Sequence, residues 1–481
     1  MFVVRQYDRV LTDAEIQRNK AIDEARFFGR IGGLDETDVV LVKSESPGDA
    51  VTVADEGAYI IRGTGTKTFT APETFTCEKG EYACAGYRVE TWDAAARVWN
   101  VAETSAARTK TFSGTSGAAN RRLVWLWTLT QGIRSAADYT TADYVQAGLA
   151  SNFDGINNYG ATRSHYNSAG IWLNLADGGP DATLVATALS DPSKSAVAGS
   201  WAADGYTFGG KNHFALKEKV AFGQQLSAQF VMAYDHDSNI GSYPNIFGTT
   251  ANTGRDDLIV YFDRSSGNVK NGLKMRPNFK LHNVTRHTMA SDWTGPYLNV
   301  FYDDLERKKA SISNAELPAW VKSNASGTLP SWPYTIGTGR NATQQTRMFV
   351  GKISSVRLYN RILTDDELHQ NRKVDEIRFN NGFANYVNLV VAYGANEDDI
   401  AATASRPAGE YEVTGSWTVT ADEVAADDHR YVPFVQVETW NNGGWTAAGR
   451  ASGASYTATD SAKVRLTYTW RRKRGLTIIV R

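Results

Sequence analysis

The fold of this chain is decided by a stretch that occurs twice, first as Val4-Arg5-Gln6-Tyr7-Asp8-Arg9-Val10-Leu11-Thr12-Asp13-Ala14-Glu15 and again as Val356-Arg357-Leu358-Tyr359-Asn360-Arg361-Ile362-Leu363-Thr364-Asp365-Asp366-Glu367. Continued through residues 27 and 379, the gapless alignment has 13 identities over 24 positions. In both copies an alternating run leads into an S/T-x-x-E capping box, Thr12 with Glu15 and Thr364 with Glu367. The pattern predicts a short strand followed by a short amphipathic helix. The capping box stabilises that helix and indicates no chemistry.

A second, looser repeat surrounds the motif Val-Glu-Thr-Trp, which occurs at residues 89–92 and 437–440. Each copy reaches a further tryptophan, Trp99 or Trp445, and ends in an alternating aromatic run at 123–129 or 464–470. Short alternating runs between Gly, Ser, Asn and Asp turns are typical of an antiparallel β-sandwich of about 100 residues. The sequence therefore predicts one small sandwich, immunoglobulin-like or similar, that is present twice.

The long segment between these repeats contains strand-like runs at 144–155, 208–216, 227–234, 258–263, 297–302 and 347–359, with almost no helical pattern between them. Strands without crossover helices indicate antiparallel sheets that face each other. We therefore predict an all-β chain, an antiparallel two-sheet jelly roll flanked by two smaller β-sandwich domains. The predicted segments are 1–30, the closing strand and helix of a truncated domain; 31–138, a small sandwich; 139–382, the jelly roll; and 383–481, the second small sandwich. This order is expected of a fragment of a longer tandem-repeat protein.

Two stretches carry a family resemblance. Gly148-Leu149-Ala150-Ser151-Asn152-Phe153-Asp154-Gly155 looks like an opening strand, and Phe349 to Thr364 is similar to the closing motif G-x-I-x-x-V/I-R-I/L-Y-N-R-x-L-S/T. They resemble the LamG-like, concanavalin A-like jelly-roll family of bacterial secreted or surface proteins, over residues of about 140–380, with a truncated second copy at 1–27. The chain departs from the family at Ser354, where Asp is common. The resemblance implies an extracellular or cell-surface location and a carbohydrate ligand.

Composition excludes several classes of function. Lys and Arg number 51 and Asp and Glu 52, a formal net charge of -1, so no basic surface indicates a nucleic-acid partner. No apolar run approaches the ~18 residues that a membrane span needs. The start of the chain, Met1 to Arg5, lacks the pattern of a signal peptide, so none is expected within this segment.

No pattern of a catalytic site is present. Related jelly-roll hydrolases carry an E-x-D-x-x-E strand that aims two carboxylates into one cleft, and this strand is absent. G-x-S-x-G, H-E-x-x-H, Walker and dinucleotide motifs are absent as well. The chain is expected not to be an enzyme.

Calcium has two separate candidate sites. Asp235, Asp237 and Asn239 place oxygen side chains at alternate positions, a spacing also found in calcium loops, although a solvated hairpin turn explains it equally simply. Asp154 follows the opening strand, and family members often bind calcium with loop carboxylates at such places. Its alternative is an ordinary Asp-Gly turn.

Aromatic side chains beside Gly, Pro, Ser or Asp are candidates for stacking on sugar rings. The candidates are Trp201, Tyr206, Tyr243, Trp293, Tyr297, Trp332 and Tyr334. Because Trp and Tyr bury large apolar areas, core packing is the alternative for each of them.

The chain has two cysteines, Cys77 and Cys84, whose equivalents in the other small sandwich are Ala425 and Val432. The loss of both together favours a disulfide between them, which would require an oxidising location. Two independent buried thiols are the alternative.

These patterns predict a non-catalytic extracellular carbohydrate-binding or adhesion module, a fragment of a larger tandem-repeat protein whose neighbouring repeats are possible partners. A purely structural spacer is the alternative, and an accessory segment of a glycoside hydrolase is a third. Calcium is the one cofactor considered.

Overall fold

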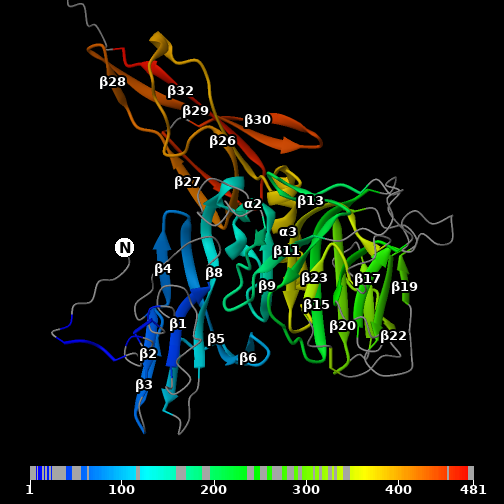
Figure 1. Ribbon diagram of the computed structural model, residues 1–481. Helices are drawn as coiled ribbons and strands as arrows, with labels where there is room; N and C mark the ends of the chain where they lie inside the picture. The colour runs from blue at the N-terminus through cyan, green and yellow to red at the C-terminus, as the bar shows by residue number, and fades with distance from the viewer. Residues whose placement is uncertain are drawn as a thin grey trace, which may run out of the picture.

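The structure is a computed structural model (Figure 1). It describes residues 39–45, 56–61, 64–114, 120–158, 170–186, 196–235, 243–249, 257–262, 273–278, 287–290, 295–306, 309–313, 317–322, 328–329, 333–339, 347–451 and 454–474, together with 7, 9–12, 16, 19, 20 and 23. Nearly all of these residues that form regular structure lie in strands, which confirms the predicted all-β class.

The middle of the chain forms two eight-stranded antiparallel sheets (Figure 1). One sheet has the order β10 (Ile171–Trp172), β11 (Ala182–Ala186), β14 (Asn212–Leu216), β23 (Tyr334–Ile336), β16 (Asn245–Thr249), β17 (Asp257–Phe262), β18 (Leu273–Asn278) and β19 (His287–Ala290). The other has β12 (Ser200–Ala202), β13 (Gly205–Gly209), β24 (Val350–Tyr359), β15 (Gln225–Tyr234), β20 (Tyr297–Asp303), β21 (Lys309–Ser313) and β22 (Val321–Lys322), with β9 (Leu149–Asp154) also paired to β24. The predicted antiparallel two-sheet jelly roll is thus confirmed.

The repeated stretch supplies the central strand of the second sheet. Strand β24 pairs with β15 along one edge, and with β13 and then β9 along the other. Its side chains alternate between two buried faces, because Val356 and Leu358 join the core between the sheets whereas Arg357 and Tyr359 lie on the outer side. Successive side chains of a strand point to opposite faces, so the apolar residues of this stretch face the core and the polar ones face the outer side.

Helix α3 (Asp365–Phe379) covers that outer face (Figure 1). It begins at the predicted capping box, in which Thr364 and Glu367 satisfy each other's backbone N–H groups. Leu368 packs with Tyr359 and Phe301 of the sheet below. The other helices in the described residues are short: α2 (Gly155–Asn158), η1 (Ala136–Asp138), η2 (Thr141–Asp143), η5 (Gly382–Asn385) and η6 (Glu397–Asp399). Within the described residues, none of the helices has the length and apolar character that crossing a membrane requires.

Each small sandwich has one large sheet covered by a two-stranded sheet. The first contains β1 (Val39–Glu45), β2 (Gly57–Ile60), β4 (Thr74–Cys77), β5 (Gly80–Asp93), β6 (Val98–Ser105) and β8 (Asn120–Arg134), covered by β3 (Thr66–Thr70) and β7 (Thr109–Ser113). The second contains β25 (Leu389–Tyr393), β26 (Gly409–Thr414), β28 (Val424–Ala426), β29 (His429–Asn441), β30 (Gly444–Ala451) and β32 (Val464–Arg472), covered by β27 (Ser416–Thr420) and β31 (Ser455–Thr459). The equivalent pairs β1–β8 and β25–β32 are parallel, which corrects the wholly antiparallel prediction for these domains. The first and last strands of each sandwich lie side by side and run in the same direction.

The two small sandwiches share one continuous sheet, which the sequence did not predict. The last residues of β8 pair with β26, Ile133 opposite Val413. Ile133 is buried in the apolar core of the second sandwich, although its strand belongs to the first. The small domains are therefore joined by backbone hydrogen bonds and by a shared core.

The predicted disulfide is wrong, because Cys77 and Cys84 are not bridged to each other. In the β4–β5 hairpin Cys77 lies opposite Gly80, and the amide of Cys84 donates to the carbonyl of Glu73 at 2.8 Å. Cys84 is thus level with a residue four positions before Cys77, which is about 13 Å along a strand. Bridged cysteines have Cα atoms within about 7 Å of each other.

Candidate functional site

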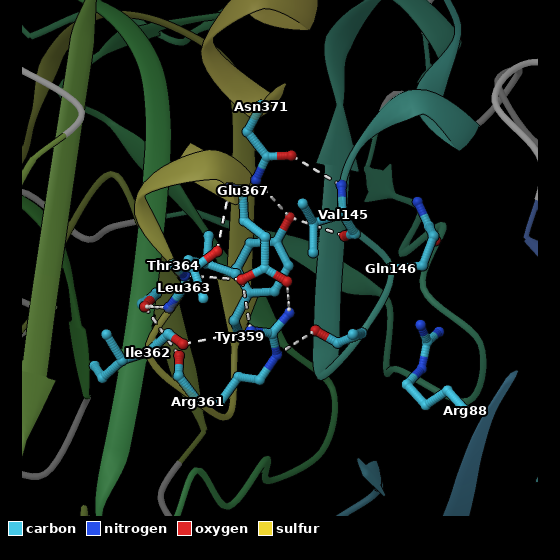
Figure 2. A network of polar contacts seen from close by, with 12 residues as sticks. Arg88, Val145, Gln146, Tyr359, Arg361, Ile362, Leu363, Thr364, Glu367 and Asn371 are labelled. Carbon is cyan, nitrogen blue, oxygen red and sulfur yellow. Dashed lines mark hydrogen bonds and ion pairs between the residues drawn. The ribbon is translucent and has the colours of Figure 1, made fainter. Parts of the chain in front are cut away.

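The closing strand and α3 are fastened by a buried polar network (Figure 2). The Tyr359 hydroxyl donates to the carbonyl of Val145 at 3.1 Å and accepts from Asn371 Nδ2 at 3.0 Å. Asn371 Oδ1 accepts from the Val145 amide at 2.9 Å, so the segment before β9 is held from both sides. Arg361 binds Glu367 with two nitrogens at 2.7 and 2.6 Å. Burial raises the pKa of Glu367, but Arg361 and Thr364 more than offset this and hold that pKa below its ordinary value. These side chains stabilise the domain and leave no open site.

Asp154 belongs to the same fastening and does not fit a calcium site. Its carboxylate is fully buried and accepts from Arg378 at 2.8 and 3.1 Å. It also accepts from the amide of Asn157 at 2.8 Å, which caps the turn after β9. A guanidinium from α3 therefore supplies the positive charge that a metal would supply. The role predicted for Asp154 is corrected to that of a structural ion pair.

The second calcium candidate lies at the edge of the described structure. Asp235 follows β15 directly and its amide donates to the carbonyl of Val350 at 3.1 Å. Asp237 and Asn239 lie outside the described residues. Among the residues that are described, no three His, Cys, Asp or Glu side chains gather closely enough to hold a metal ion.

Three of the predicted sugar-stacking residues are core residues instead. Tyr206, Tyr297 and Tyr334 are buried, and Tyr206 and Tyr334 pack between the two sheets. Burial raises the pKa of Tyr297 to about 12, and its hydroxyl accepts from Asn380 after α3. The rings of Tyr206 and Tyr334 fill the core between the sheets, whereas the Tyr297 ring is buried on the outer side beneath Arg372 of α3. The prediction that they bind sugar is corrected.

The other predicted aromatics divide into two groups. Trp201 is half-buried and packs edge-on against Trp172 and Tyr206, so it closes the end of the core. Tyr243 is half-buried and contacts Tyr261 and the guanidinium of Arg347. Trp293 and Trp332 lie outside the described residues. Within the described part of the chain, Trp201 and Tyr243 contact separate sets of residues.

A different site lies where β8, η1 and η2 meet α3. A cavity of about 340 Å³ opens there, which we call the β8–α3 cavity. Its lining combines the aromatics Trp127 and Tyr139 with apolar Leu126, Leu129, Ala142 and Val374 and with polar Glu45, Thr128, Arg134, Asp143, Gln370 and Lys373. Ligand sites commonly have volumes of about 300–1,000 Å³ and a few polar groups on a largely apolar wall. The cavity therefore has the size and character of a small-ligand site.

The polar wall of the cavity is held rigidly. Arg134 binds Asp143 at 2.6 Å, donates to the carbonyl of Asp138 at 2.8 Å, and stacks on Tyr139 with 3.8 Å from the guanidinium carbon to the ring centre. Gln370 of α3 donates to the carbonyl of Asp143 at 2.8 Å. Burial, followed by the negative charge of Glu412, raises the pKa of Tyr139, so its hydroxyl stays protonated and donates to Glu412. Fixed groups of this kind lower the entropic cost of binding a ligand.

The lining of the β8–α3 cavity could not be found from the sequence alone. Trp127 lies in the aromatic run at 123–129, and this was the one signal present. Its partners Asp143 and Gln370 are distant in sequence and are brought together by the packing of α3 beside β8. The indole N–H of Trp127, a residue that is 6% exposed, has no hydrogen-bond partner within the described residues.

No family model matches the chain, and no curated protein sequence matches it. Among solved structures, domain 4 of the GH43 extracellular arabinanase AbnA from Geobacillus stearothermophilus, in complex with arabinotriose, is 11% identical with a TM-score of 0.33, over 47% of this chain and 98% of that one. A mutant sialidase of Trypanosoma rangeli with trans-sialidase activity is 12% identical with a TM-score of 0.30, over 66% and 46%. The CBM40 of the Ruminococcus gnavus IT-sialidase, bound to α2,3 sialyllactose, is 14% identical with a TM-score of 0.23, over 31% and 80%. These neighbours are glycan-binding or glycan-hydrolysing proteins, and at such scores they assign no function to this chain.

Proposed function

We propose that the chain is a non-catalytic carbohydrate-binding module of an extracellular or cell-surface protein, and that the β8–α3 cavity holds the sugar. The observation that carries this proposal is a cavity of about 340 Å³ whose wall combines apolar side chains with fixed hydrogen-bonding groups. Sugars present an apolar ring face and a rim of hydroxyls, and a wall of this mixture suits both. The location and the glycan ligand follow from the family resemblance.

The chemistry of the wall indicates what the ligand offers. Lys373 and Gln370 supply N–H donors from α3, and Asp143 and Glu45 supply acceptors. A neutral or acidic saccharide of short length fits this set, with an affinity in the micromolar to millimolar range that is usual for a shallow site.

The proposal is tested on a glycan array with the full chain, in the presence and absence of calcium. Ala142 is exposed at the edge of the cavity, and Ala142→Trp fills the cavity without touching a core. Retention of the bound glycan should fall by about tenfold or more, equivalent to ~1.4 kcal/mol. Ala102→Trp on β6, an exposed alanine away from the cavity, is the matched control and should retain wild-type binding. Equal glycan binding by both variants would show that the glycan binds outside the β8–α3 cavity. The absence of binding to any glycan on the array at millimolar concentration would exclude the proposal.

Melting curves recorded with and without calcium test the remaining calcium candidate. We propose the turn at Asp235, Asp237 and Asn239 as a weak calcium site that orders its loop. Asp237→Asn should then abolish any calcium-dependent rise in melting temperature, whereas an unchanged calcium effect would exclude the turn.

A structural spacer is the second candidate function, and one observation favours it. The pairing of β8 with β26 joins the two small sandwiches into one sheet, as expected for a module that sets a fixed distance along a repeat protein. The array separates the two candidates, because a spacer binds no glycan with or without calcium.

A further inference from the structure

A pair of tryptophans in the first small sandwich lies at its contact with the jelly roll. Trp92 and Trp99 lie opposite each other on β5 and β6, with ring centres 5.4 Å apart. Gly178 of the jelly roll lies so close to Trp92 that an added Cβ would be 2.5 Å from the indole. The amide of Ala221 donates to the carbonyl of Ala96 at 3.2 Å, beside the same hairpin. This hairpin is therefore packed tightly against the jelly roll.

A buried ion network completes this contact. Glu90 is fully buried, binds Arg122 closely, and accepts from Arg88 at 2.8 Å. Arg122 then reaches across to Asp177 of the jelly roll at 2.6 Å, and Lys43 binds the same carboxylate at 2.7 Å. The Asp177-Gly178 corner of the jelly roll is thus recognised by charge at Arg122 and Lys43 and by close packing at Trp92.

The second small sandwich builds the same surface again. Trp440 and Trp445 face each other across β29 and β30, with ring centres 5.1 Å apart. Glu438 accepts from Arg465 at 2.6 Å, and these two residues hold the same register as Glu90 and Arg122.

The stacking of the arginine is repeated as well. The Arg465 guanidinium lies 4.7 Å from the ring centre of Trp445, where the Arg122 guanidinium lies 4.3 Å from that of Trp99. The residue pairs, their register and their stacking are therefore preserved between the two copies.

The two copies differ in what covers them. Trp440 is 42% exposed, whereas its equivalent Trp92 is half-buried; Trp445 is half-buried, whereas its equivalent Trp99 is 3% exposed. The side chains of Glu438 and Arg465 are 17% and 33% exposed, against 0% and 6% for Glu90 and Arg122. The second copy thus leaves more exposed the residues whose equivalents in the first copy are covered by the jelly roll.

We propose that the surface formed by Glu438, Trp440, Trp445 and Arg465 binds a further jelly-roll domain of the same type as residues 139–382. This further domain follows β32 in the chain, just as residues 139–382 follow β8. The occupant is identified by the first copy, where Arg122 and Trp92, the equivalents of Arg465 and Trp440, hold the Asp177-Gly178 corner of a jelly roll together with Lys43. The acidic corner meets Arg465, and the small residue after it lets the backbone approach the tryptophan pair. The jelly roll within this chain is not the occupant, because its Asp177 is already bound by Arg122 and Lys43.

The N-terminal copy of the closing element independently indicates another such domain. Asn19 donates to the Tyr7 hydroxyl at 2.9 Å, as Asn371 donates to Tyr359 at 3.0 Å. Tyr7 is nevertheless 44% exposed, whereas Tyr359 is buried completely (Figure 2). The N-terminal copy thus keeps the hydrogen bond between its asparagine and its tyrosine. Its tyrosine is exposed, whereas the tyrosine of the second copy is buried against a jelly roll.

The test is an extended chain, residues 1–474 followed by a second copy of residues 132–481. The seam keeps the strand register, since Leu123 and Leu466 are equivalent through their partners Val89 and Val437. The terminal copy carries Thr446→Ser, so that the peptides containing its Trp440 and the inner Trp440 differ in mass. Hydroxyl-radical footprinting then reads the solvent access of each tryptophan.

Oxidation of the inner Trp440 should fall about fivefold or more, to the level of a tryptophan in an interface core. The terminal Trp440, which has no domain behind it, is the matched control and should react as it does in the 481-residue chain. Asp177→Arg in the appended domain should restore oxidation of the inner Trp440. The proposal is overturned if both Trp440 side chains react equally. Protection of Trp172 in the appended domain shows whether that domain has folded, and equal reaction overturns the proposal in either case. Protection of Trp440 in the 481-residue chain by added glycan would instead make the surface a sugar site.

Discussion

Arg357 is buried completely on the outer side of β24, and its guanidinium binds both carboxylate oxygens of Asp375 in α3. Tyr144 covers the pair, with its ring centre 4.0 Å from the guanidinium carbon and its hydroxyl 2.9 Å from Asp375. A buried pair of this kind contributes little beyond a well-packed apolar pair, but the loss of one partner leaves an uncompensated charge. The contribution of this arginine and aspartate to the stability of the fold therefore explains why both residues recur in the two copies of the repeated stretch.

Arg357→Ala should therefore lower the free energy of unfolding by roughly 3–5 kcal/mol. Lys473→Ala removes an exposed ion pair with Glu423 and should cost only about 0.5 kcal/mol. Urea denaturation followed by circular dichroism measures both. Equal losses for the two variants would contradict the structural role of the buried pair.

Glu90 makes the contact between the first small sandwich and the jelly roll sensitive to acid. Burial raises its pKa, but Arg122 and Arg88 more than offset this, and the pKa is lowered overall. A carboxyl whose pKa is lower in the folded state stabilises the fold above its ordinary pKa, and this stabilisation is lost as the pH falls through the lowered value.

The melting temperature of the wild type should therefore fall steeply below about pH 4, where carboxylates take up protons. Glu90→Gln should be less stable at pH 7 and should show a shallower decline, so the two curves converge in acid. Melting curves recorded from pH 7 to pH 3 test this. Two parallel curves would show that Glu90 does not carry the acid sensitivity.

Individual elements were predicted with unequal success from the sequence. The strand and capped helix at 350–379 were readable because their signals are local, namely alternation and the Thr364–Glu367 spacing. The parallel pairing of β1 with β8 and the β8–α3 cavity were not readable, because both depend on which distant segments meet. Local composition also could not separate a buried tyrosine such as Tyr334 from an exposed one, since both stand beside turn residues.

The β4–β5 hairpin gives a prediction opposite to the one that the sequence favoured. Because its register keeps Cys77 and Cys84 apart, thiol titration of the unfolded, unreduced protein should find two free thiols per chain. The Cys84→Val variant, which copies the equivalent residue of the second sandwich, should titrate as one. A count of zero in the wild type would show that the hairpin shifts its register when oxidised.

At the scale of the whole molecule, the small domains are joined where β8 pairs with β26, and one buried side chain crosses this joint. Ile133 belongs to β8 of the first sandwich and lies in the core of the second, beside the backbone pairing with Val413. If the molecule functions as a fixed spacer, or presents its cavity at a fixed place along a repeat, this joint must stay closed. A loose joint would leave the second sandwich tethered and free to turn.

Ile133→Ala removes three buried carbons from the joint and should lower the free energy of unfolding of the second sandwich by about 2–4 kcal/mol. Val101→Ala, on an exposed position of β6, is the matched control and should change it by less than about 0.5 kcal/mol. The joint itself is read by small-angle scattering at neutral pH, where the wild type should fit one rigid shape. The Ile133→Ala variant should show a larger radius of gyration while its circular dichroism stays that of a folded β protein. If scattering from the two proteins is identical although stability has dropped, the backbone pairing of β8 with β26 holds the joint without the core contact. If the wild type already scatters as a flexible chain, the small sandwiches move independently in solution and the spacer function loses its support.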